Sequence, residues 1–240
     1  MTRVFYNSQY LLFMVPAFLL MLITSWYVKS AYKKWGRVPA RSQLTGSEAA
    51  QRLIAHSGLY GIQIQNVAGN LTDNYDPRTR ILHLSQGVAQ TASVASLAVA
   101  AHELGHAQQD AEGYLPLRFR SALVPMVNIG STLGWILVML GLFLSYAGMA
   151  LGINIAWLGV VIFAGGAVFA LATLPVELNA SGRARRLLTE TGIISSPDEQ
   201  RGVNAVLNAA ALTYVAALVT AVLQVLYYAS LIGGLGRRRR

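Results

Sequence analysis

Long apolar stretches on either side of one polar region dominate the hydropathy pattern of this 240-residue chain. The apolar stretches are residues 4–28, 121–176 and 202–236, and none of them contains Asp, Glu, Lys or Arg. A transmembrane helix needs about 20 apolar residues. The first and last stretches can therefore each cross a bilayer once, and the middle stretch can cross twice with a loop near residues 145–154. The pattern predicts about four transmembrane helices.

A cleaved signal peptide is the alternative interpretation of the first apolar stretch. Its apolar run is long for a signal peptide, and the following sequence SWYVKSAYKKWG has no clear small-x-small cleavage site. We therefore expect a retained membrane anchor.

The polar region, residues 30–120, changes between helical and extended patterns. Residues 45–58 have capping-box spacing and a terminal glycine, which predict a helix. Residues 61–67 alternate like a short strand, and residues 71–85 indicate a strand, a turn and a second strand. Residues 93–109 are rich in Ala and Leu and predict another helix. The residues expected to mark these ends and turns are Thr45, Glu48, Gly58, Asp76, Pro77, Thr91 or Ser93, Gly113 and Pro116.

The last of these helices carries the sequence HELGH at residues 102–106. Side chains four positions apart on a helix are neighbours on one face, about 6 Å apart, so His102 and His106 can bind one metal ion. Glu103 points to another part of the helix surface and can hold a water molecule, as in the HExxH pattern of metallopeptidases. Chance gives this pattern in roughly one shuffled chain in several hundred. The alternative is a buried helix with two hydrogen-bonded core histidines.

A catalytic zinc ion has three protein ligands in addition to water, so a third ligand is needed. The candidates are Asp110, Glu112, His83 and Glu177. The helix axis carries Asp110 and Glu112 away from the ion. For His83, in the second predicted strand, a place on the strand face near the substrate is the alternative. Glu177 is the first charge after the long uncharged stretch, and a carboxylate leaving the membrane needs a partner such as a metal ion.

The surroundings of Glu177 suggest further roles. We expect Pro175 to begin a helix there, and an ion pair of Glu177 with Arg183 or Arg185 is the alternative to a ligand role. The residues that could orient a ligand from behind are Ser181, which follows Glu177 by four, and the nearby Asn179. Tyr214 is a candidate oxyanion stabiliser, with ordinary helix packing as the alternative. His56 is most simply a partner of the first predicted helix's C-terminal end.

Composition and charge support a membrane location. The chain is 54% hydrophobic and 12% charged, whereas soluble domains carry about 25% charged residues. The net charge of +9 gathers at the ends of predicted spans, which is the positive-inside pattern rather than a nucleic-acid surface. We expect the polar region in the cytoplasm and the N-terminus outside. The basic residues expected on the cytoplasmic side are Lys29, Lys33, Lys34, Arg37, Arg41, Arg118, Arg120, Arg183, Arg185 and Arg186.

Two further observations qualify this topology. The cluster Arg237–Arg240 would lie outside after a fourth full crossing, so either the last segment does not cross fully or the earlier charges decide the orientation. The absence of cysteine excludes disulfides and cysteine-based zinc sites.

Four blocks of the chain resemble the YugP-like membrane zinc metallopeptidases: LTDNYDPRTRILHLS, AVAAHELGHAQQ, LPVELNASGRA and ALTYVAALVTAVLQVLYY. They follow one another across nearly the whole chain. The resemblance implies His102 and His106 as zinc ligands, Glu103 as the catalytic glutamate and Glu177 as the third ligand. The arrangement is also similar to the HtpX-type and CAAX-prenyl-type membrane gluzincins. In these an aspartate often follows the ligand glutamate by four, where this chain has Ser181.

We therefore expect a mainly α membrane protein with about four transmembrane helices and a small zincin-like α+β cytoplasmic unit containing the HExxH helix. The expected segments are an N-terminal anchor at 1–29, the catalytic region at 30–120, two transmembrane helices at 121–176, the third-ligand helix and a polar segment at 177–202, and a C-terminal transmembrane helix with a basic tail at 203–240.

The expected activity is hydrolysis of peptide bonds in membrane-associated proteins, with one Zn²⁺ per chain and Glu103 as general base. The strand RILHLS is expected to lie at a sheet edge and to pair with an extended substrate. A membrane scaffold or partner-binding subunit with structural zinc is the alternative, and a site inside a span or a small transporter is disfavoured. The glycines that indicate close helix packing, within this chain or with another copy or a membrane partner, are Gly130, Gly134, Gly141 and Gly148.

Overall fold

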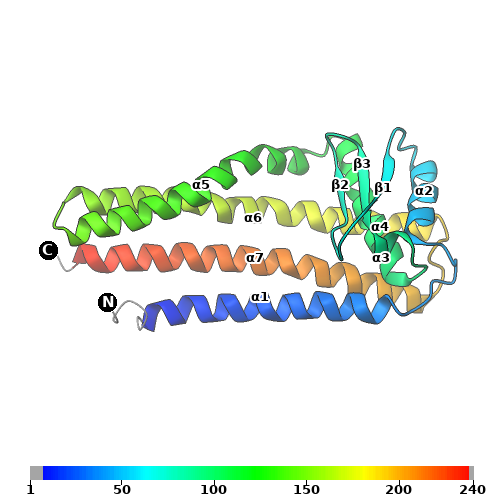
Figure 1. Ribbon diagram of the computed structural model, residues 1–240, viewed down its shortest axis with the longest axis horizontal. Helices are drawn as coiled ribbons and strands as arrows, with labels where there is room; N and C mark the ends of the chain where they lie inside the picture. The colour runs from blue at the N-terminus through cyan, green and yellow to red at the C-terminus, as the bar shows by residue number, and fades with distance from the viewer. Residues whose placement is uncertain (1–7, 238–240) are drawn as a thin grey trace. The chain divides into compact units, whose positions relative to one another are not determined.

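The computed structural model describes residues 8–237, with side chains up to residue 234. Within these residues it contains seven helices and three strands (Figure 1). They are α1 (Ser8–Trp35), α2 (Gly46–Ser57), β1 (Gln63–Val67), β2 (Asn74–Asp76), β3 (Ile81–Ser85), α3 (Gln86–Ala89), α4 (Val94–Ala111), α5 (Leu115–Tyr146), α6 (Leu151–Glu190) and α7 (Pro197–Arg237).

The chain divides into two compact units, to which the four long helices all contribute. Among the described residues, the helical unit comprises residues 8–23, 118–174 and 213–237. The mixed unit comprises residues 24–117 and 175–212, and it contains the sheet and the shorter helices.

Four apolar helices form the helical unit. α1, α5, α6 and α7 are each long and apolar enough to cross a membrane, which confirms the predicted number of such helices. In this unit they run alongside one another (Figure 1). α5 ends at Tyr146 and α6 begins at Leu151, so the turn between them lies inside the predicted loop. The predicted basic cluster at the C-terminal end lies outside the described side chains.

Glycines allow α5 and α6 to approach closely. A Cβ added at Gly134 would lie 2.8 Å from a backbone nitrogen of α6, and one at Gly141 would lie 2.3 Å from the nitrogen of Ala156. Side chains do not tolerate such distances, so this backbone contact requires glycine. Gly134 and Gly141 therefore pack within the chain, which is one of the two possibilities that the sequence left open, whereas Gly130 and Gly148 make no contact of this kind.

The sheet of the mixed unit has the strand order β1-β3-β2. β1 pairs parallel to β3, and β2 pairs antiparallel to it. β3 is therefore the central strand, and the prediction that RILHLS lies at an edge is wrong. A parallel pair cannot be recognised from local alternation, because its two strands are joined by a crossover rather than by a turn. In this sheet the crossover contains β2.

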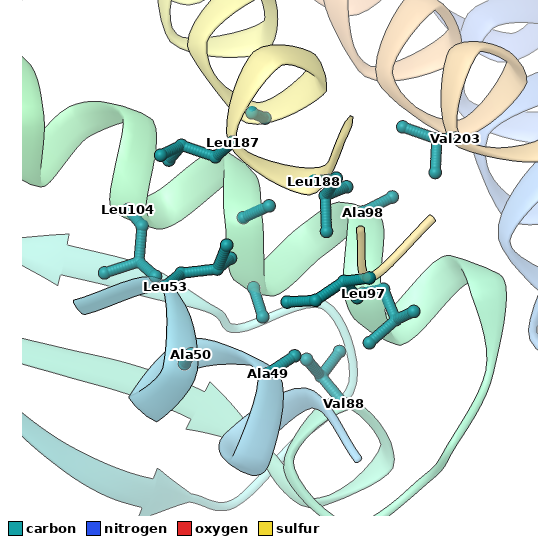
Figure 2. Close-up of a cluster of buried hydrophobic side chains, with 14 of the residues drawn as sticks. Ala49, Ala50, Leu53, Val88, Leu97, Ala98, Leu104, Leu187, Leu188 and Val203 are labelled. Carbon is teal, nitrogen blue, oxygen red and sulfur yellow. The ribbon is translucent and has the colours of Figure 1, made fainter. Parts of the chain in front are cut away.

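A hydrophobic core joins the sheet to the helices of the mixed unit. Leu82 and Leu84 of β3 are fully buried, and each such side chain stabilises the fold by about 2 kcal/mol. The close-up in Figure 2 shows Leu97 and Leu104 of α4 between α2 and the polar end of α6. The remaining labelled residues of this core are Ala49, Ala50, Leu53, Val88, Ala98, Leu187, Leu188 and Val203. This packing holds α4 against β3 and against α2, α3, α6 and α7.

Caps define the helices of the mixed unit as the sequence predicts. Thr45 Oγ1 accepts from the backbone N–H of Glu48, and the Glu48 carboxylate accepts from the N–H of Thr45, which confirms the capping box. Gly58 ends α2 in the left-handed region with φ +63°. Ser93 is the N-cap of α4 and accepts from the N–H of Ser96.

One predicted boundary is wrong. α6 continues through Pro175 without interruption, so this residue does not begin a helix. Proline removes only one backbone N–H from the helix ladder, and α6 continues for 15 residues beyond it, up to Glu190.

Candidate metal centre

α4 presents two imidazole rings on one face. His102 and His106 are separated by one helical turn, and their ring centroids lie 4.9 Å apart with an interplanar angle of 83°. Both side chains are only 13% exposed. The i, i+4 spacing alone brings the rings together, as the HELGH sequence predicts.

Glu177 of α6 meets both rings. Its Oε2 lies 3.3 Å from His102 Nε2 and 3.4 Å from His106 Nε2, and its side chain is 3% exposed. These three residues form the group of donors that could hold a metal ion among the described residues. The sequence therefore singled out the three side chains that the fold brings together.

The spacing and chemistry of these donors fit zinc. Two ligand atoms that each lie about 2.05 Å from a tetrahedral zinc ion are about 3.3 Å apart. The distances of 3.3 and 3.4 Å from Glu177 to the two imidazole nitrogens agree with this value. Two imidazoles and one carboxylate are also a donor set of catalytic zinc sites, in which the fourth position takes water or substrate.

A glycine between the two histidines lets α4 approach α6. A Cβ added at Gly105 would lie 2.4 Å from the carbonyl oxygen of Ala180 and 3.0 Å from its carbonyl carbon. No side chain fits there without moving backbone. Because Ala180 follows Glu177 by almost one turn, this contact sets the distance between the imidazoles and the carboxylate.

Polar side chains contact the outer nitrogen of each imidazole. Ser181 Oγ lies 3.2 Å from His102 Nδ1, and Gln109 Oε1 lies 3.0 Å from His106 Nδ1. Ser181 and Gln109 are both buried. Partners of this kind fix the orientation of a ligating ring. Ser181 thus occupies the place in space that its position four residues after Glu177 predicts.

Asn179 contacts the centre indirectly. Its Oδ1 accepts from Gln109 Nε2 at 2.9 Å and from Arg183 Nε at 2.7 Å. It therefore holds Gln109, which in turn contacts His106. Asn179 is thus one side chain further from the imidazoles than Ser181 is.

Glu103 points to the sheet instead of to α6. Its Oε2 accepts from the backbone N–H of Tyr75 in β2 at 3.0 Å. Burial raises the pKa of Glu103, and this effect outweighs the opposing influence of His102 and His106. The carboxyl group is thus held by one strand while it stays in the electrostatic reach of both imidazoles.

The other acidic candidates have partners elsewhere. Asp110 accepts from the hydroxyl of Tyr75 at 3.0 Å. Glu112 accepts two hydrogen bonds from Arg183, at 2.6 and 2.7 Å. Neither belongs to the group of metal donors, which agrees with the expectation that the helix axis carries both away from the ion.

The alternative ion pair of Glu177 is not formed with either candidate arginine. Arg183 pairs with Glu112, and Arg185 donates to Asn204 and Asn208, each at 2.6 Å. Oε2 of Glu177 lies beside the two imidazoles instead.

His83 takes a place on the sheet. Its neighbours Leu82 and Leu84 are buried in the core that contains α4, so the alternation of strand side chains puts His83 on the opposite face. It is not a member of the metal-donor group. His56 lies in the last turn of α2, as predicted. Tyr214 belongs to the helical unit, and its role in catalysis stays a prediction.

Two residues of the centre were not predicted. Gln109 follows His106 by three, a spacing that puts both on one helix face, so the sequence contains a usable signal for it. Tyr75 contributes a backbone N–H, which every residue type except proline has, and no sequence signal identifies it.

Comparisons with known proteins agree with this centre. The family described as "Putative neutral zinc metallopeptidase" matches residues 10–233. A Bacillus subtilis (strain 168) protein named "Putative membrane protease YugP" is 41% identical over 202 residues, which cover 84% of this chain and 86% of that protein. No solved structure matches. The family match spans both units, and it confirms the family predicted from the sequence blocks. The chain therefore belongs to the family described as "Putative neutral zinc metallopeptidase".

Proposed function

We propose that this chain is a membrane zinc endopeptidase that hydrolyses peptide bonds in membrane or juxtamembrane segments of proteins. The observation that carries this proposal is the position of Glu177 Oε2, 3.3 Å from His102 Nε2 and 3.4 Å from His106 Nε2, in a group of three metal donors. One bound Zn²⁺ would lower the pKa of a water molecule towards 7 and polarise the scissile carbonyl group. All other steps belong to side chains of the mixed unit.

Glu103 is the proposed general base and acid. It takes the proton from the attacking water and delivers it to the leaving amine. The N–H of Tyr75 holds one of its oxygens, which limits the orientations that the carboxyl group adopts. Burial raises the pKa of Glu103, and a raised pKa suits a carboxyl group that must both accept and release a proton near neutral pH.

The edge strand β2 is the proposed docking strand for an extended substrate. The order β1-β3-β2 leaves one side of β2 without a partner strand, and free strand edges bind peptides through backbone hydrogen bonds. The N–H of Tyr75 bonds to Glu103 rather than to β3. A substrate that pairs with this edge would therefore lie beside the general base. We propose this role for β2 in place of β3, for which the sequence predicted it.

The ends of the helices support a site at the cytoplasmic face of the membrane. On α1, the exposed aromatic residues Trp26 and Tyr27 precede Lys29, Lys33 and Lys34. Aromatic residues at the lipid interface followed by lysines are typical of the cytoplasmic end of a span. Substrates would then be membrane proteins or their juxtamembrane loops, with the bilayer as the second partner and no role for nucleic acid.

The Glu103→Gln variant tests the proposed chemistry. We expect purified protein in detergent to bind one zinc ion per chain and to cleave casein or a mixture of quenched fluorescent peptides, and the variant to keep zinc and lose cleavage. Glu190→Gln is the matched control, because Glu190 is exposed at the end of α6. Cleavage by the Glu103 variant at the wild-type rate would refute the catalytic role.

Metal analysis of Glu177→Ala tests the third ligand. We expect a large loss of zinc affinity, because two imidazoles alone leave the site open. Unchanged affinity would exclude Glu177 as a ligand. The scaffold alternative predicts a different pair of results, in which zinc is bound but neither wild-type protein nor the Glu190 control cleaves any substrate of this set.

A further inference from the structure

Gln109 lies behind His106 and is completely buried, with an exposed fraction of 0%. Its Oε1 lies 3.0 Å from His106 Nδ1. Its Nε2 donates to the backbone carbonyl oxygen of Val176 at 2.8 Å and to Asn179 Oδ1 at 2.9 Å. The one amide group therefore links an imidazole of α4 to two positions on α6, on either side of Glu177.

The partners determine which way this amide group faces. The carbonyl oxygen of Val176 can only accept a hydrogen bond, so the group that faces it must be the NH₂. Asn179 Oδ1 also accepts from Arg183 Nε at 2.7 Å, and a guanidinium group can only donate. This second contact fixes the orientation of Asn179 independently. Both acceptors therefore require the nitrogen of Gln109, and its oxygen must face His106.

The orientation of Gln109 determines that Nδ1 of His106 carries a proton. An amide oxygen only accepts, so Nδ1 of His106 must carry the proton in this contact. A neutral imidazole with its proton on Nδ1 has a free lone pair on Nε2. That nitrogen is the one that faces Glu177 at 3.4 Å.

His102 has no equivalent constraint from its partner. Ser181 Oγ lies 3.2 Å from His102 Nδ1, and a hydroxyl group can donate or accept. This contact orients the ring of His102 without selecting a tautomer. The two imidazoles of the centre thus differ, and only the partner of His106 selects the proton position.

An ion pair between Arg183 and Glu112 also connects α4 to α6. Arg183, which fixes Asn179, also makes two hydrogen bonds to Glu112 at the C-terminal end of α4, at 2.6 and 2.7 Å. The contacts run from His106 through Gln109, Asn179 and Arg183 and return to α4. Movement of α4 relative to this part of α6 would break several of them together.

We propose that Gln109 is a positioning residue that locks His106 in its Nδ1-protonated tautomer and directs Nε2 to the metal. The inference deepens the proposed zinc site and rests on it. Because Val176 directly precedes Glu177, the same amide group also holds α6 at the point where the third ligand leaves the helix. Loss of such a partner typically weakens metal binding 10- to 100-fold.

Three variants in the full-length protein test this role. Gln109→Met is of similar size but cannot bridge His106 to Val176. Asn179→Asp keeps an acceptor for both Gln109 and Arg183, so it is the conservative variant. Gln108→Met is the matched control, because the side chain of the neighbouring Gln108 donates to Ser57 Oγ at 3.5 Å and not to His106 or Val176.

Zinc affinity is measured by competition with a chelator, and the tautomers by ¹⁵N NMR of labelled histidines in metal-free protein. We expect affinity to fall about 10- to 100-fold in Gln109→Met, to change at most a few-fold in Asn179→Asp, and to stay unchanged in Gln108→Met. In wild-type protein His106 should carry its proton on Nδ1, and Gln109→Met should give a mixture of tautomers.

Wild-type zinc affinity in a folded Gln109→Met variant, or a His106 Nδ1 without a proton in wild-type protein, would overturn the proposal. The second measurement needs no variant, so the inference stays testable if Gln109→Met does not fold. A wild-type protein that binds no zinc would refute the proposed function, whereas the tautomer of His106 in metal-free protein tests Gln109 separately.

Discussion

Gly105→Ala changes one position at which α4 and α6 meet. The added Cβ would lie 2.4 Å from the carbonyl oxygen of Ala180, whereas ordinary contacts begin at 3.4 Å, so the two backbones must separate by about 1 Å. Gly105 lies between His102 and His106 in the sequence, and Ala180 lies three residues after Glu177. The separation therefore acts directly on the gap between the imidazoles and the carboxylate.

The size of this displacement predicts a large effect on metal binding. Metal–ligand distances in a working site vary by only about 0.2 Å, so a shift several times larger should weaken zinc binding by about 10- to 100-fold. Overpacking should cost about 1–3 kcal/mol of folding free energy, partly offset by about 1 kcal/mol from the higher helix propensity of alanine. Chelator competition measures the first effect, and thermal unfolding in detergent measures the second.

Gly182→Ala provides the matched control. It makes the same change on α6, two residues from Ala180, but its Cβ would meet no atom within 4 Å. We expect unchanged zinc affinity and a stability gain of up to about 1 kcal/mol. If Gly105→Ala bound zinc as tightly as Gly182→Ala does, close contact between α4 and α6 would not determine the geometry of the centre.

Two further predictions concern the stability of the mixed unit. Arg183 holds the pKa of Glu112 below its usual range, so the ion pair stabilises the fold above the ordinary carboxyl pKa of about 4.3 and is lost as pH falls through the lowered value. Thermal unfolding of wild type and Glu112→Gln should differ at pH 7, by less than about 1 kcal/mol for this exposed carboxylate. The difference should disappear once the pH is below the lowered pKa of Glu112, and a difference that does not change with pH would contradict the pairing. Thr45→Ala removes the N-cap of α2 and should lower the free energy of unfolding by about 1 kcal/mol, whereas an unchanged melting temperature would show that the cap contributes nothing.

Local patterns pointed to most of the side chains that the structure brings together, whose roles as ligands stay a prediction. His102 and His106 follow from the helical repeat, since four positions complete about one turn. The prediction that Glu177 has a partner such as a metal ion follows from the free-energy cost of an unpaired carboxylate next to a membrane. Ser181 follows from its position one turn beyond Glu177. Each of these predictions depends on neighbours within a few residues or on one long uncharged stretch.

Predictions that depend on distant partners were less successful. β3 is central rather than at an edge because it pairs with β2 on one side and with β1, which precedes β2 in the sequence, on the other. Pro175 lies inside α6 because the helix on both sides of it is long enough to tolerate one missing hydrogen bond. The N–H of Tyr75 lies within hydrogen-bonding distance of Glu103 only because the sheet places β2 beside α4. Nearly every residue type has a backbone N–H, so the sequence does not indicate this contact.

The sequence by itself determined the four apolar helices, the caps of α2 and α4, and the pair of histidines on one helix face. These features arise from periodicity, hydropathy and local hydrogen bonds, which act between near neighbours. The tertiary structure alone decided that α4 and α6 touch at Gly105 and Ala180 and that Gln109 bridges them. Those contacts join residues about 70 positions apart, and they result from packing of the shared core, which no local pattern specifies.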